Sequence, residues 1–207
     1  YPAAASNTMN VGRKLSARDF ELAAPKGANK VEARVIGIIE NQAPTKALQL
    51  PLNVKSGLVE MDRENDVCQI SIVERHRASG SVVNAYVSGF GYDVDCAIAS
   101  TVAHDSHHII VVGTNRADMA QAANVLSEIG GGVVVVSKGE ELARIELPIA
   151  GLMSIEPAEI VAAKAEKMVA AMKACGCSLN NAYMQHSLLA LVVIPELRIS
   201  DVGLIDV

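Results

Sequence analysis

The sequence predicts an α/β fold: a layered mixed β-sheet with covering helices, including a βαβ crossover at about residues 109–136. The first observation behind this prediction is composition, because half of the 207 residues are hydrophobic while Trp is absent and Phe occurs only twice. Val, Ile, Leu and Ala supply the apolar surface instead, which is typical of a layered α/β core. The second observation is that short β-branched runs alternate with segments of helical periodicity.

The first 17 residues are small, polar and aperiodic, and we expect a linker or extended arm there, followed by one domain over residues 18–207. Ser16 and Asp19 have the spacing of a capping box, which predicts a short helical turn near Phe20. The chain opens on Tyr1 and not on Met, so the simplest expectation is an excerpt from, or a processed part of, a longer polypeptide.

Strand signals dominate the first half of the domain. Residues 30–39 alternate in part and residues 45–54 form a weaker extended segment, so the two are expected to pair like a hairpin. Residues 66–73 have the pattern of a buried strand. Residues 82–87 fit either a strand or the start of a helix, and residues 96–103 fit either a strand or a buried helix.

The clearest supersecondary unit is the predicted crossover. Residues 109–112 and 133–136 are apolar runs typical of buried strands. A helix over residues 116–129 is predicted between them, capped by Thr114 or Asn115. Strand, helix and strand at this spacing predict a right-handed parallel crossover.

Two helices are predicted in the C-terminal third. Residues 142–147 alternate like a half-exposed strand, and Pro157 opens a helix expected to reach about residue 174. Residues 180–189 are expected to be helical. The remaining expectations are a strand or helix end at residues 191–194 and a tail at residues 198–204.

Composition also narrows the classes of function. The net charge of −5 and the lack of a Lys/Arg block argue against a nucleic-acid partner. No apolar run approaches the ~18 residues that a membrane span needs. Four cysteines are present, but Cys175 and Cys177 have no second pair to complete a zinc site, so we expect reduced structural thiols in a cytosolic protein.

The strongest chemical signal is the segment from His104 to His107, which holds Asp105 and Ser106 and lies just before a predicted buried strand. Two imidazoles and a carboxylate can converge there on either a strand or a helical turn. Such a cluster suits proton transfer or hydrogen bonding to a ring nitrogen. The alternative is a polar strand edge that caps neighbouring backbone groups. A self-contained metal site is disfavoured, because catalytic metal sites normally draw ligands from several elements.

A second group, Glu74, Arg75 and His76, ends the strand predicted at residues 66–73. Parallel-sheet proteins place functional groups at such strand ends. The alternative is a solvated strand end with Glu74 and Arg75 paired, which contributes little energy. The remaining His186 is expected to be a surface or packed residue.

Five motifs occur in order along the chain: Val73-Glu-Arg-His76, Gly89-Phe-Gly91, Ala99-Ser-Thr-Val-Ala-His-Asp-Ser-His107, Ile109-Ile-Val-Val-Gly113 and Leu147-Pro-Ile-Ala-Gly-Leu-Met-Ser154. Together they resemble the C-terminal domain of bacterial and archaeal adenine deaminases, in the amidohydrolase superfamily. The resemblance covers about residue 7 to the end. One departure is His108, where the family usually carries Asn.

The resemblance implies the C-terminal part of an enzyme that hydrolyses adenine to hypoxanthine and ammonia in purine salvage, in the cytoplasm and as a homodimer. Its catalytic barrel would precede this domain and hold a divalent metal, with manganese first and iron or zinc as alternatives. No catalytic or metal-ligating residue carries over, because the chain has no His-x-His, so the isolated chain is expected to be inactive.

The polar signature of the domain itself does carry over, as candidates for the substrate pocket: His104, Asp105, Ser106, His107, Glu74, Arg75 and His76. Under this hypothesis the segment from His104 to His107 faces the barrel mouth and helps to shape the purine pocket. Two rival hypotheses are a purely structural domain that packs on the barrel and mediates dimerisation, and a stand-alone binding or regulatory domain.

Overall fold

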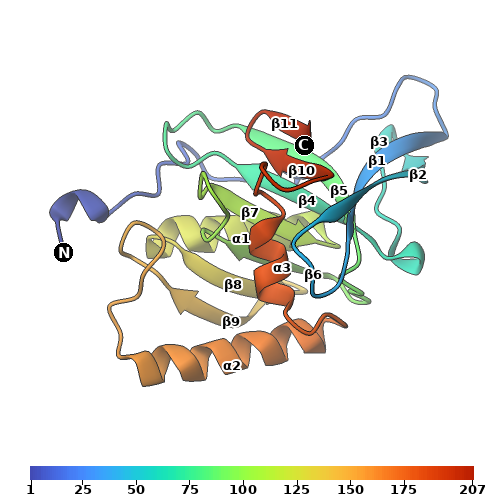
Figure 1. The fold of residues 1–207 in the computed structure, drawn as a ribbon. Coiled ribbons are helices and arrows are strands. Elements are labelled where there is room, and N and C mark those ends of the chain that lie inside the picture. Colours follow the sequence, from blue (N-terminus) through green and yellow to red (C-terminus); the bar gives the residue numbers. More distant parts are fainter.

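A computed structural model describes residues 1–207 and contains a nine-stranded mixed sheet with helices on both faces, as Figure 1 shows. Its strands are β1 (Lys30–Ile38), β2 (Thr45–Lys55), β3 (Leu58–Val59), β4 (Val67–Val73), β5 (Val82–Ser88), β6 (Cys96–Ser100), β7 (Ile109–Gly113), β8 (Gly132–Ser137) and β9 (Glu140–Glu146), and β10 (Leu197–Ser200) and β11 (Gly203–Asp206) form a separate hairpin. The helices are α1 (Arg116–Ile129), α2 (Ala158–Ala174) and α3 (Ala182–Leu188), with 3-10 turns at Ala3–Ala5, Ala17–Phe20 and Arg63–Asn65. The predicted fold class is confirmed.

The strand order is β3-β2-β1-β5-β4-β7-β6-β8-β9, so β3 and β9 are the edge strands. Only β1 and β5 are parallel neighbours; every other adjacent pair is antiparallel. The predicted crossover is present, but it spans an intervening strand. Because β7 and β8 both run antiparallel to β6, they are parallel to each other, and α1 connects them across β6.

The two segments that the sequence left ambiguous are both strands. Residues 82–88 form β5 and residues 96–100 form β6. The expected hairpin is also confirmed, with Lys30 opposite Asn53 at one end and Ile38 opposite Thr45 at the other. All five residues of β6 are buried. A strand buried on both faces loses the alternation that separates strand from helix in a sequence.

One face of the sheet is covered by α1 and by the N-terminal arm. Asn115 caps α1, because its side chain accepts hydrogen bonds from the backbone N–H groups of Ala117 and Asp118 at 2.9 and 3.2 Å. Val11 and Leu15 of the arm are buried in the same apolar cluster as α1. The expected turn at Ala17–Phe20 carries the predicted capping box. The arm therefore contributes to the core on this side.

The other face carries α2, α3 and the β10–β11 hairpin, which lie over a core of 28 buried residues. His186 on α3 is packed inside this core against Phe90, and neither of its ring nitrogens has a hydrogen-bond partner. Burial lowers the pKa of His186 to about 3, so the ring is neutral. The four cysteines are buried and free, as expected.

The C-terminal prediction was wrong in two places. Residues 191–194 are neither a strand nor a helix end but a turn segment, and the expected tail is the β10–β11 hairpin. The sequence concealed this hairpin because Arg198 suggests exposure, whereas it is 1% exposed. Its guanidinium donates to the carbonyls of Ile194 and Leu188 at 2.7 and 2.9 Å, which satisfies the buried charge without a carboxylate.

Candidate functional site

The residues singled out from the sequence meet at one end of the central strands, where the loops that connect them lie. Antiparallel pairing places Val73 opposite Ile109 and Ser100 opposite both Ile110 and Val133. The segments after β4, β6 and β9 and those before β5, β7 and β8 consequently lie side by side. Two groups that are 28 or more residues apart in the sequence, around Glu74 and around His104, thus form one site.

Arg75 connects the loops at this end of the strands. Its side chain is 2% exposed, and it donates to the carbonyls of His107, Thr8 and Ala150, the last two at 3.1 and 3.0 Å. Four separate segments of the chain are thereby joined by one guanidinium. No carboxylate pairs with it, so the expected ion pair between Glu74 and Arg75 is absent. Burial lowers the pKa of Arg75.

Glu74 holds the loop that follows β4. Its carboxylate accepts hydrogen bonds from the backbone N–H groups of His76, Arg77 and Ser79 and from the Ser79 hydroxyl. Burial alone would raise the pKa of Glu74, but these hydrogen bonds outweigh it and lower the pKa to about 2. With four donors directed at it, the carboxylate has little capacity left for a ligand.

The segment from residue 104 to residue 108 presents its histidines on two sides. The rings of His104 and His107 lie 5.4 Å apart, next to the end of α3, where His104 Nδ1 is 3.4 Å from the Ser187 carbonyl. His107 has a left-handed backbone, with φ +52°, and its Nδ1 accepts the Ala103 N–H at 3.2 Å. Asp105 and Ser106 lie between them with exposed side chains.

These contacts assign the protons of the first histidine pair. His107 Nδ1 accepts a hydrogen bond, so in the neutral ring its proton is on Nε2. His104 Nδ1 faces a carbonyl and therefore carries the proton, which leaves its Nε2 as an acceptor. Burial, and then the neighbouring His104 and Arg75, lower the pKa of His107, which favours the neutral ring. The pair offers one donor and one acceptor.

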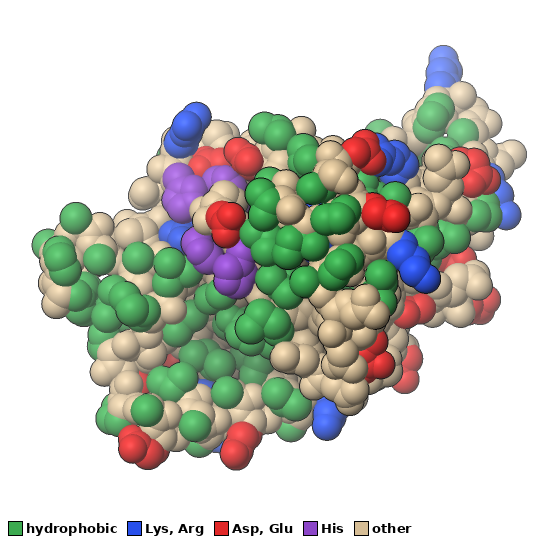
Figure 2. Space-filling model, in the orientation of Figure 1, with side chains coloured by type: hydrophobic (Ala, Val, Ile, Leu, Met, Phe, Trp, Pro, Cys, Tyr) green, Lys and Arg blue, Asp and Glu red, His purple; other side chains and the backbone are tan.

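The second histidine pair lies on the other side of the loop. His76 and His108 have ring centroids 4.7 Å apart, and His76 Nε2 is 2.7 Å from the Ser106 carbonyl. They line a polar cleft of about 330 Å³ together with Glu74, Arg77, Ser79, Ser81 and Asp201. Burial and the nearby His76 lower the pKa of His108. In Figure 2 the histidine side chains gather in one group at the upper left of the visible face.

The sequence analysis missed two residues that belong to this group of loops, Asp201 and Thr101. Asp201 approaches His108 Nε2 at 3.6 Å, but it belongs to the C-terminal hairpin and no local pattern links it to the site. Thr101 accepts the Gly132 N–H at 2.8 Å and donates to the Gly151 carbonyl, so it fastens the neighbouring loops together. The available signal was a threonine within the apolar run of residues 96–103.

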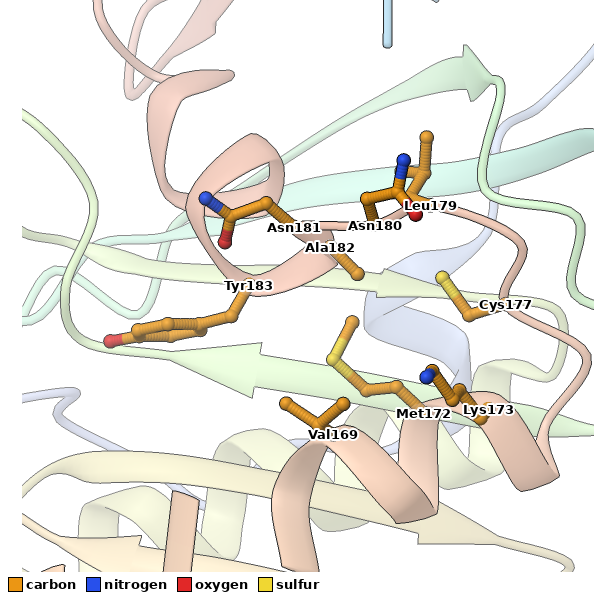
Figure 3. A pocket seen from close by; sticks show the side chains of 9 residues that line it. All are labelled: Val169, Met172, Lys173, Cys177, Leu179, Asn180, Asn181, Ala182 and Tyr183. Carbon is orange, nitrogen blue, oxygen red and sulfur yellow. The ribbon is translucent and has the colours of Figure 1, made fainter. Parts of the chain in front are cut away.

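A separate recess lies between α2 and the start of α3, and Figure 3 shows its lining. Met172 and Cys177 point into it, while the Tyr183 ring points away. Its volume is about 40 Å³. That is enough for a few waters and far below the ~300 Å³ or more of ordinary ligand pockets.

The donor groups of this chain do not fit the divalent metal that the resemblance implies. No group of three or more His, Cys, Asp and Glu side chains is arranged to hold a metal ion. No helix of the structure has both the length and the apolar character needed to cross a membrane. The arrangement is suited to hydrogen bonding at the His104–His107 pair and to mechanical support by Glu74 and Arg75.

Comparisons with known proteins agree on one family. The profile of the adenine deaminase C-terminal domain matches residues 42–207. Adenine deaminase 3 of Rhizobium meliloti is 70% identical over the whole chain, which covers 35% of that protein, and the adenine deaminase of Mesorhizobium japonicum is 71% identical, with 34% covered. The adenine deaminase of Rubrobacter xylanophilus is 42% identical over the whole chain, again with 34% covered. The chain therefore spans about a third of the length of the curated relatives it matches.

Proposed function

Because this chain belongs to the adenine deaminase C-terminal domain family, we propose that it is the C-terminal part of an enzyme that hydrolyses adenine to hypoxanthine and ammonia. The observation that carries the proposal is the 70% identity over all 207 residues to a protein named adenine deaminase. In this proposal the catalytic groups and any divalent metal belong to the preceding part of the polypeptide. Manganese is the proposed metal, with iron or zinc as alternatives.

The proposed role of this domain is to pack on the metal-binding barrel and complete the purine pocket. The His104–His107 pair carries this part of the proposal, because it presents a donor and an acceptor on two rings whose centroids lie 5.4 Å apart. Adenine has a matching edge, since its N6 amino group donates and its N7 accepts. A neutral His107 would donate Nε2–H to a ring nitrogen, and His104 Nε2 would accept from the amino group.

Glu74 and Arg75 have a supporting role in this proposal. Their polar atoms are engaged with the backbone of the surrounding loops, so they fix the position of the histidines and leave the purine to the His104–His107 pair. Rigid support of this kind is what a site needs to orient a flat ligand. Asp105 and Ser106, with exposed side chains between the two histidines, remain candidates for contact with the purine or the barrel.

The test uses the full-length protein and measures ammonia release from adenine. Replacing His107 by Asn keeps a residue that tolerates the left-handed backbone and removes the imidazole. We expect turnover per folded molecule to fall about 100-fold, the scale of a lost acid–base or orienting group. His108→Asn is the matched control, because His108 lies on the other side of the loop and the family usually carries Asn there.

A loss of only two- to three-fold in His107→Asn would contradict the pocket role, because it corresponds to less than about 1 kcal/mol of barrier. The isolated 207-residue chain, assayed with added manganese, should release no ammonia above a heat-treated control, since it has no metal-binding group of side chains. Turnover by this chain alone would contradict the assignment of the catalytic groups to the preceding part.

Three further parts of the proposal concern the setting of the enzyme. We propose a cytoplasmic location, a place in purine salvage and a homodimeric state. The buried free thiols agree with a reducing compartment. Sedimentation velocity of the full-length protein tests the dimer, and cell fractionation tests the location.

A further inference from the structure

Exposed apolar side chains are concentrated in the last part of the chain. Eleven large apolar side chains are exposed, and nine of them come after residue 150: Met153, Ile155, Ile160, Val169, Met184, Val192, Val193, Val202 and Val207. They belong mainly to the segment before α2, to α2 itself, to α3 and to the turn after it. We name the outer surface of residues 151–196 the helical face. In Figure 2 it is widely apolar and hollowed below the histidine group.

α2 contributes apolar side chains only at the margins of its exposed side. Its buried residues are Met168, Ala171 and Met172. Ile160 and Val169 are 46% and 45% exposed, but they lie on opposite flanks of the helix, with exposed charged residues between them. Large exposed apolar patches mark interaction sites, and the most exposed apolar side chains of the helical face lie outside α2, at Met153, Ile155 and Val193.

The opposite face of the molecule is different. The groove between α1 and the N-terminal arm is lined by polar and apolar residues in equal number, and Lys14, Gln121, Asn124 and Glu128 are among the polar ones. None of its apolar residues is an exposed large side chain. The exposed large apolar side chains are therefore concentrated on the helical face.

We infer that the helical face is the docking surface for the part of the polypeptide that precedes Tyr1 in the complete chain. The first reason is length: this chain covers 34 to 35% of its relatives, so most of a protein of that size lies outside it. This inference rests on the proposed function and specifies which surface of the domain meets the barrel.

The second reason is where the chain enters. The Ala150 N–H donates to the Ala5 carbonyl at 2.7 Å, so the N-terminal turn is fixed three residues from Met153. Figure 1 shows the N-terminus on the same side of the molecule as the loop that leads into α2. A preceding domain joined at Tyr1 thus starts at the margin of the helical face.

The third reason is continuity with the candidate site. The backbone N–H of His104 donates to the Ser187 carbonyl of α3 at 3.2 Å, so the histidine loop borders the helical face. A domain that covers this face would also close over the His104–His107 pair. Docking and enclosure of the purine would then be one event, which excludes water from the pocket.

Met153 and Met184 are natural reporters, because they are 58% and 44% exposed in this domain and thioethers oxidise readily. We would expose the full-length protein to hydroxyl radicals and measure oxidation of each methionine by mass spectrometry. If the helical face is covered, both oxidise as slowly as Met168 and Met172, each 2% exposed. Oxidation of either methionine faster than that of Met168 and Met172 would overturn the inference.

Protein concentration separates the preceding domain from a second copy of the chain. Footprinting is repeated at a concentration where sedimentation velocity shows only monomers. Protection that persists in the monomer supports docking of the preceding part. Protection that disappears on dilution means that another copy covers the face, and this inference is then wrong.

A matched pair of substitutions provides the second readout. Ile155→Lys places a charge in the helical face, and we expect faster oxidation of Met153 and separate unfolding transitions for the two domains. Leu142→Lys is the control, because Leu142 is also exposed but belongs to β9, outside the helical face. Equal effects of the two substitutions would count against docking at this face.

Adenine turnover is measured on the same full-length preparation, so that the two proposals can fail separately. Protection of Met153 and Met184 without deamination would contradict the proposed function and leave the docking surface intact. Deamination with both methionines reactive would contradict the docking surface alone.

Discussion

Glu74→Gln is expected to destabilise the protein at neutral pH and to remove part of its acid sensitivity. The carboxylate of Glu74 accepts four hydrogen bonds from the loop after β4. A glutamine has one acceptor oxygen and an amino group that would face these donors. The substitution is nearly isosteric, so it tests the charge and the acceptors and not the volume of the side chain.

The pKa of Glu74 gives the magnitude. The ordinary value is 4.5 and the folded value is about 2. At about 1.4 kcal/mol per pKa unit, this difference sets an upper limit of about 3.5 kcal/mol. Because glutamine keeps one acceptor oxygen for these donors, we expect a loss of about 2 kcal/mol at pH 7.

The sign of the pH dependence follows from the lowered pKa. Between pH 4.5 and 2 the unfolded chain binds a proton at Glu74 that the folded chain does not bind. The contribution of Glu74 is therefore complete above pH 4.5 and is lost as the pH falls towards 2. The Glu74→Gln variant should lack this part of the acid slope and should approach the parent protein at low pH.

Urea unfolding followed by circular dichroism at a series of pH values measures both effects. Glu60→Gln is a suitable control, because Glu60 is a more exposed carboxylate that makes a single, long contact to Arg116 at 3.4 Å. If Glu74→Gln changes the free energy of unfolding at pH 7 by less than about 0.5 kcal/mol, the loop is not held by this carboxylate and the reasoning is refuted.

Two further substitutions test the interior. His186→Leu should leave stability unchanged or raise it at pH 7, because it removes two unpartnered buried nitrogens. The folded pKa of His186 is about 3, so protonation of the unfolded chain lowers stability as the pH falls below about 6.5, and His186→Leu should flatten that slope in urea titrations. Arg75→Lys should cost about 2 kcal/mol or more in urea unfolding, because a lysine cannot reach the carbonyls of Thr8, His107 and Ala150 together. It should also speed proteolysis of the N-terminal arm, and an arm as resistant as in the parent would contradict this role of Arg75.

The sequence was sufficient wherever the signal was local. The runs at residues 109–112 and 133–136 identified their strands, and the pair Thr114 and Asn115 marked the start of α1. The family resemblance came from such local motifs as well. Periodicity, caps and turn residues depend on neighbours in the chain, so they can be read without a structure.

What could not be predicted was non-local. The insertion of β6 between β7 and β8, and the approach of the loop at Glu74 to the loop at His104, depend on strand order and register. Arg75 and Arg198 were misleading for the same reason. A buried arginine is satisfied by distant backbone carbonyls, and nothing in its own segment shows that they exist.

The two edge strands of the sheet, β3 and β9, have a consequence for aggregation. β3 is only two residues long, and β9 carries Glu140, Glu141, Arg144 and Glu146 along its free edge. Short and charged edge strands resist pairing with strands of other molecules, which is how many β proteins avoid amyloid-like growth. The folded sheet is thus protected at its backbone edges, and any self-association through it is left to side chains.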